Sequence, residues 1–208
     1  MVIELHGSIH DLEHIKQYHQ QRETAITQLG ITVLWFTNVN AQEIKFGAKA
    51  GINIANINGD NTSSLEPVAA FNFGLVTEIP ISQKFSFQPE IMFSGQGYSF
   101  EGSDGNIVAL SYLNVPLMAK YYVVKGLSLE AGPQIGYLLS AKNESTNVKD
   151  TFKKVDFAAN LGIGYKLENG LNFGARYNFG LTNINNLEGS SSKNKNSVFQ
   201  LSIGYFFF

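Results

Sequence analysis

The chain has 208 residues, a formal net charge of −2, sixteen Phe, nine Tyr, twenty Gly and no Cys. The length fits one domain with an extension, and a pI near 6.1 gives no reason to expect nucleic acid as a partner. Without cysteine, disulfides and thiolate metal sites are excluded, and no apolar run approaches the roughly 18–20 residues that a membrane-spanning helix needs.

The first 41 residues differ in character from the rest of the chain. Residues 12–29 indicate a polar helix, and residues 31–36 (ITVLWF) are apolar. A secretory signal opens with a basic region, which Met1-Val-Ile-Glu does not provide. Val39-Asn40-Ala41, followed by Gln42-Glu43, is nevertheless typical of a leader cleavage site. We therefore expect an N-terminal extension over residues 1–41 and a separate domain over residues 42–208.

Residues 1–40 resemble a fragment of a very-short-patch-repair-like endonuclease domain. The matching positions are Glu4, Gly7, His10, Tyr18, Arg22, Gly30, Val33, Leu34 and Phe36. His6 and His19 stand where that pattern has acidic residues, so the resemblance leaves endonuclease activity only as a remote alternative. Imidazoles four residues apart on a helix can share a zinc ion, and His6, His10 and His14 have that spacing. We favour solvated histidines and expect no metal site.

From residue 44 to the C-terminus, apolar and polar residues alternate with the period of two that is typical of strands. The sequence predicts eight strands, at residues 44–54, 71–79, 85–94, 113–121, 127–139, 155–166, 171–179 and 199–207. Their apolar faces carry no charged residue. Nine charges occupy the opposite faces, which are also rich in Gly, Ser and Asn and indicate a packed polar lumen: Lys45, Lys49, Glu78, Glu90, Lys120, Glu130, Asp156, Lys166 and Arg176.

The connections between these strands alternate in length. Residues 80–84, 123–126 and 167–170 form short connections, whereas 56–66, 98–107, 141–153 and 183–196 form long, polar ones. Outer-membrane barrels have this arrangement, with long loops outside and tight turns in the periplasm. A soluble sandwich alternates in polarity too, but has no reason to sort its loops. A lipocalin-like barrel, apolar inside and polar outside, also fits this loop pattern poorly. We expect an all-β, eight-stranded, antiparallel up-and-down transmembrane β-barrel.

Several segments resemble the porin-like outer-membrane β-barrel family over residues 43–208. They are FGAKAGINIANI, SYLNVPLMAKYYV, LSLEAGPQIGYLL, FAANLGIGYKLENGLNFGARYNFGL and the terminal FQLSIGYFFF. The resemblance implies a monomer in the bacterial outer membrane, with lipid and the barrel-assembly machinery as partners. Gly204 stands one residue later than the family pattern would place it.

Two groups of residues are candidate features of the barrel. Tyr121, Tyr165 and Tyr205 lie near strand ends on the apolar face, where they predict an aromatic girdle at the membrane interface; tyrosine is also simply a good strand former. On the polar faces, one set of charges is expected to form a lumen network that fills the interior: Lys49, Glu90, Lys120, Glu130 and Arg176. A catalytic or conducting cluster is the alternative interpretation.

The predicted barrel contains no histidine, so it has no Ser-His-Asp triad and no histidine-ligated metal, and we expect no cofactor. The sequence favours a non-enzymatic outer-membrane barrel that serves envelope structure, adhesion or ligand contact through long loops. A narrow porin or transporter for small solutes is the alternative.

Overall fold

The structure is a computed structural model that describes residues 43–102, 106–187 and 189–207. The N-terminal extension, with His6, His10, His14 and the endonuclease-like motif, lies outside these residues. Among the residues described, no helix is long and apolar enough to cross a membrane.

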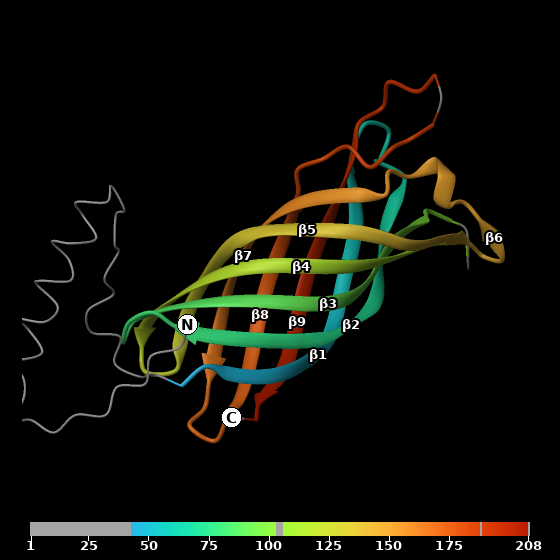
Figure 1. Cartoon of the computed structure of the whole chain (residues 1–208). Coiled ribbons are helices and arrows are strands. Elements are labelled where there is room, and N and C mark those ends of the chain that lie inside the picture. Colours follow the sequence, from blue (N-terminus) through green and yellow to red (C-terminus); the bar gives the residue numbers. More distant parts are fainter. Residues whose placement is uncertain (1–42, 103–105, 188, 208) are drawn as a thin grey trace, which may run out of the picture. The chain divides into compact units, whose positions relative to one another are not determined.

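The described residues form one antiparallel sheet (Figure 1). Its strands are β1 Lys45–Gly59, β2 Leu65–Pro80, β3 Phe85–Phe100, β4 Ile107–Val124, β5 Leu127–Asn143, β6 Thr146–Asn147, β7 Val155–Lys166, β8 Leu171–Gly180 and β9 Asn194–Phe206. A short 3-10 helix, η2, covers Lys149–Thr151.

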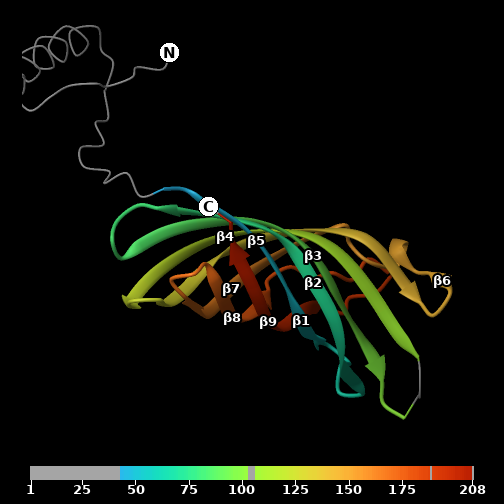
Figure 2. The same ribbon diagram turned by 90° about the horizontal axis from the view of Figure 1, so that it is seen from below.

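The sheet closes into a barrel of eight long strands, as predicted. Neighbours run in the order β4-β3-β2-β1-β9-β8-β7-β5, and β4 pairs with β5 to close the ring. Figure 2 shows the strands curving around a common interior. The first and last strands pair from Gly47 opposite Phe206 to Gly59 opposite Asn194. The small β6 adds only two residues beside β5. Closure leaves none of the eight strands as an edge, which is the condition for crossing lipid with strands.

The connections lie at two different ends of the barrel. We call the end with residues 81–84, 125–126 and 167–170 the turn end, and the opposite end the loop end. The chain enters β1 and leaves β9 at the turn end, where Phe207 donates its backbone N–H to Phe46. Two of the turns are tight because Gly126 and Gly170 adopt φ values of 84° and 91°, a left-handed conformation that glycine reaches without strain.

The strands extend further toward the loop end than predicted. The first connection, predicted over 56–66, is only residues 60–64, because β1 and β9 continue pairing through Asn58 and Lys195. The prediction of four long loops is therefore wrong at this position. The physical reason is that polar residues can extend a strand once their side chains meet water. The connections at 144–154 and 181–193 remain long.

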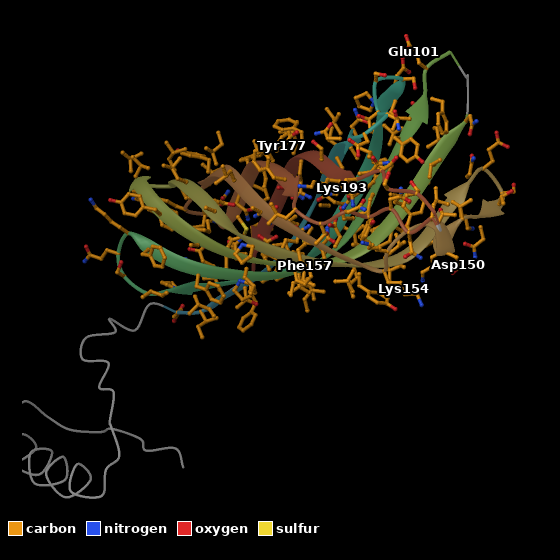
Figure 3. All side chains as sticks on the ribbon, turned by 90° about the horizontal axis from the view of Figure 1, so that it is seen from above. Glu101, Asp150, Lys154, Phe157, Tyr177 and Lys193 are labelled. Atoms are coloured by element: carbon orange, nitrogen blue, oxygen red, sulfur yellow. The ribbon has the colours of Figure 1, made fainter. Side chains whose placement is uncertain are left out.

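The predicted division of faces is confirmed along the strands. In β7, Leu161 and Ile163 are 56% and 52% exposed, whereas Asn160, which directly precedes Leu161, is 1% exposed. Figure 3 shows Phe157 and Tyr177 projecting from the outer surface, while Glu101, Asp150 and Lys154 lie toward the loop end. Exposed apolar side chains in such numbers suit a lipid environment and would be a liability in water.

Candidate functional site

The interior of the barrel is layered from one end to the other. The inward residues of β1 record the order: Lys49 lies nearest the turn end, Asn53 follows, and Ile57 lies nearest the loop end. All three side chains are buried. The interior thus passes from charge, through amides, to an apolar region, and each layer has its own contacts.

The charged layer brings all five predicted network residues together. Arg176 of β8 reaches across the lumen to Glu90 of β3 with two hydrogen bonds, of 3.0 and 2.8 Å. Its Nη2 also contacts Glu130 Oε2 at 3.1 Å. Lys49 Nζ lies 2.7 Å from Glu90 Oε2, and Lys120 Nζ lies 3.1 Å from Glu130 Oε1. The two-pronged Arg–carboxylate contact is a strong one, because both bonds are charge-assisted.

Two further charges and a tyrosine join this layer toward the turn end. Glu78 accepts hydrogen bonds from Lys166 and from the Tyr122 hydroxyl, each at 2.7 Å. Lys120 Nζ lies 4.0 Å from Glu78 and so connects the two parts. We call the seven charged residues together the charge network: Lys49, Glu78, Glu90, Lys120, Glu130, Lys166 and Arg176. They come from seven different strands, so the network ties the wall of the barrel across its interior.

The part of the charge network around Arg176 leaves little free space. The cavity among its side chains, lined by Lys49, Lys120, Glu130 and Arg176, has a volume of about 20 Å³. A single water needs about 10–15 Å³ of such volume, so the cavity holds roughly one water.

Amides form the middle layer. Asn53 Oδ1 accepts from Asn72 at 2.8 Å and from Gln200 at 3.2 Å, while Asn53 Nδ2 donates to Ser94 at 3.0 Å. These side chains come from β1, β2, β3 and β9. Because each amide is both donor and acceptor, it can bond across the lumen without needing a counter-charge.

The layer at the loop end is apolar, which corrects the expectation of a polar lumen throughout. Its buried side chains are Ile57, Val108, Leu110, Tyr112, Leu138, Ala141 and Ile184. Val148 and Phe152 from the β5–β7 connection pack against them. The apolar layer buries hydrocarbon from strands and loops together, so it closes the outer half of the interior by the same packing that stabilises a soluble core.

The connection between β8 and β9 folds over this apolar layer. Ile184 is fully buried, and its backbone bonds to Asn194 and to Lys153 at 2.8 Å each. Thr182 donates to the buried Asp156 carboxylate at 2.5 Å, and Asn196 donates to the same carboxylate at 2.8 Å. We call residues 181–193 the cap. The cap is held by both apolar and polar contacts, so its described residues lie over the apolar layer.

The three tyrosines of the predicted girdle lie on the outer surface at the turn end. Tyr121, Tyr165 and Tyr205 are each about half exposed. Tyr165 lies directly opposite Leu127 and Phe173, and Tyr205 lies opposite Leu171. Their common height and outward direction agree with the girdle geometry; the interfacial role itself stays a prediction.

Sequence reasoning missed the apolar layer and part of the charge network. The signal for the apolar layer was in β4, where Val108, Leu110 and Tyr112 continue the inward phase of Asn114. Glu78 and Lys166 were placed on the inward faces but not in the network. The alternating pattern places Tyr122 on the inward face, next to the outward Tyr121, but nothing in the sequence indicates its contact with Glu78. No cluster of three or more His, Asp or Glu side chains suited to a metal occurs among the residues described.

Comparison with known proteins supports the fold. The family model described as outer membrane protein beta-barrel domain matches residues 40–186. A search of curated proteins finds no match. The structure is similar to Neisserial surface protein A (11% identity, TM-score 0.53) and to the attachment invasion locus protein Ail of Yersinia pestis (16% identity, TM-score 0.50). In both cases the match covers 80% of this chain and 100% of the other.

The outer membrane protein OprG from Pseudomonas aeruginosa is a further match, at 14% identity and a TM-score of 0.45, covering 78% of this chain and 95% of that one. At these identities the likeness concerns the fold alone. The family match is of a different kind, because residues 40–186 are more than half of the 208-residue chain. The chain therefore belongs to the outer membrane protein β-barrel domain family and is a protein of the bacterial outer membrane.

Proposed function

We propose that the protein is a closed, non-enzymatic barrel that stands as a monomer in the outer membrane and acts through the surface of its loop end. The observation that carries this proposal is the filled interior. Ion pairs fill the interior toward the turn end, amides fill its middle, and the apolar layer with the cap fills it toward the loop end. A barrel filled in this way serves as an anchor, so the exposed loops are the part left to contact other molecules.

The loop end is suited to contact because it is internally braced. Asn183 Oδ1 accepts backbone N–H groups from Asn185 at 3.1 Å and Asn194 at 2.9 Å. Across the mouth, the backbone N–H of Asn186 donates to Thr151 at 2.9 Å, and Phe152 forms an isolated bridge with Asn185. A braced surface loses little conformational freedom on binding. This feature supports a role in adhesion, envelope structure or ligand contact.

The charged side chains of the interior support a non-enzymatic role. Glu90 and Glu130 are buried and held by Arg176, Lys49 and Lys120 at 2.7–3.1 Å. A general acid or base must come within hydrogen-bond reach of a substrate, and the cavity beside Glu130 has room for roughly one water only. We infer that they stabilise the fold.

A closed interior predicts that the protein does not conduct ions across a bilayer. In planar lipid bilayers, the purified protein is expected to give no stable openings above the lipid background, since the charge network leaves room for roughly one water. A porin of about 16 strands, whose interior is an aqueous channel, serves as the positive control for insertion.

Reproducible, ion-selective openings from correctly folded protein would contradict the closed-barrel proposal. They would favour the narrow porin or transporter for small solutes instead. Heat-modifiable gel migration of the same sample verifies that the protein in the bilayer was folded.

A further inference from the structure

A concave vestibule opens at the turn end of the barrel. It has a volume of about 760 Å³ and is lined by residues of β1, β2, β3, β4, β7 and the two turns at 81–84 and 125–126. Its floor is made by the Lys166–Glu78 ion pair and the Tyr122 ring, over which Lys166 Nζ lies at 5.0 Å. Since tight turns face the periplasm in barrels of this kind, the vestibule opens toward that compartment.

The vestibule is lined by four lysines, which differ in whether they are paired. Lys166 contacts Glu78 at 2.7 Å, and Lys125 forms an ion pair with Glu168 of the neighbouring turn. The hydrogen bond and charge of Glu168 raise the pKa of Lys125, which therefore stays protonated. Within the described part of the chain, Lys45 and Lys84 have no carboxylate within ion-pair distance. They are the two cations left without a partner.

The charge excess extends into the barrel beneath the vestibule. The charge network holds four basic and three acidic side chains, so it cannot neutralise Lys45 and Lys84. Lys45 and Lys166 both line the vestibule, so their positive charges share one cavity. The charge network alone has one excess positive charge. The residues around the vestibule add three positive charges, from Lys45, Lys84 and Lys125, and two negative charges, from Glu43 and Glu168. The turn end therefore has an excess of two positive charges.

We propose that this vestibule binds a phosphoryl group, held by the Lys45 and Lys84 ammonium groups. A phosphate monoester carries about −1.5 to −2 charges at neutral pH, which matches the excess of two. Lysine binds phosphate as a point charge without demanding a fixed geometry. Ser82 adds a hydroxyl donor, because its Oγ accepts the Phe85 N–H at 3.1 Å and keeps its own hydrogen available.

The bound phosphoryl group has two conceivable sources. One is a soluble phosphate in the periplasm, and the other is the head group of a phospholipid in the adjacent leaflet. Either one would neutralise the excess positive charge of the vestibule. Glu43 and Glu78 also line the vestibule. Glu78 is already matched by Lys166 and lies 4.0 Å from Lys120, so Glu43 is the one lining carboxylate that opposes an anion.

The test uses the full-length protein folded in an amine-oxide detergent, which contains no phosphate. Equilibrium dialysis measures binding of inorganic phosphate, and co-elution measures binding of phosphatidic acid added at low mole fraction to the micelles. Three proteins are compared: the unchanged chain, the Lys45→Gln/Lys84→Gln double variant, and a control with Lys142→Gln and Lys154→Gln. The control removes two exposed lysines at the loop end.

The expected result is one phosphoryl group bound per barrel, with affinity at least about tenfold lower in Lys45→Gln/Lys84→Gln and unchanged in the control. If binding of inorganic phosphate depends on these lysines, the natural ligand is a soluble phosphate. If only the binding of phosphatidic acid depends on them, the natural ligand is a lipid head group. Equal binding by all three proteins, or no binding of either probe, overturns the proposal. If the double variant fails to show heat-modifiable migration, the single exposed-turn variant Lys84→Gln replaces it.

Discussion

Replacing Arg176 by methionine is expected to destabilise the folded barrel by about 3–5 kcal/mol, the usual cost of removing one partner from a buried ion pair. Arg176 donates to Glu90 at 3.0 and 2.8 Å and to Glu130 at 3.1 Å. Without it, Lys49 and Lys120 are the cations that remain in contact with these two buried carboxylates. The measurement is equilibrium unfolding by denaturant in lipid vesicles.

Two comparisons make this result specific. Lys154→Met removes an exposed positive charge at the loop end and is expected to change stability by less than about 0.5 kcal/mol. The double variant Arg176→Met/Glu90→Gln removes one charge of each sign, so its loss is expected to fall below the sum of the two single losses. A loss for Arg176→Met no larger than that for Lys154→Met would show that the charge network does not hold the barrel together.

Replacing Leu161 by lysine is expected to cost about 2–4 kcal/mol of folded stability, the cost of a basic residue near the bilayer midplane. Leu161 projects outward from the middle of β7, four residues from the girdle residue Tyr165. Ile163→Lys, closer to Tyr165, should cost less, because a long lysine can reach the interface from there. Unfolding in lipid vesicles measures both losses.

Leu187→Lys is the matched control for this series. Leu187 is as exposed as Leu161, at 54% against 56%, but it lies in the cap at the loop end, where water surrounds it. Its replacement is therefore expected to be nearly neutral. Equal losses for Leu161→Lys and Leu187→Lys would mean that β7 does not face hydrocarbon.

The repeated features of the barrel could be predicted from the sequence. Strand number and face assignment follow from a period-two pattern. The up-and-down arrangement follows from the alternation of short and long connections, and closure follows from the need to satisfy every backbone group in lipid. Lys49, Glu90 and Arg176 could be placed inside because each shares the phase of Gly, Ser and Asn residues on its own strand. Parity alone identified the inward residues without any knowledge of their partners.

What could not be predicted depends on contacts between distant segments. Ile184 belongs to a polar connection, and only the folded structure brings it onto Leu110 and Leu138. The contact between Arg176 and Glu90 likewise joins residues 86 apart in the chain. Strand ends were also misplaced, since polar residues such as Asn56 and Asn58 remain paired in β1 beyond the last lipid-facing position. Local pattern carries no information on such pairings.

The two ends of the barrel differ in construction. At the loop end the cap packs over an apolar layer, and the turn end opens into a vestibule lined by four lysines. Between them, the charge network and the amides fill the lumen. Function is therefore expected at the two surfaces and not along a path through the barrel.

The central claim is that the apolar face of each strand meets lipid while the opposite face fills the interior. Adjacent residues of β4 test it directly: Leu113 points outward and Tyr112 is fully buried inside. In a Trp35→Phe background, which removes the only tryptophan of the chain, Leu113→Trp and Tyr112→Trp each report one face. With bromine-labelled lipids in the bilayer, we predict strong quenching of the Leu113→Trp emission and weak quenching for Tyr112→Trp. Equal quenching of the two, or the reverse order, would contradict the account.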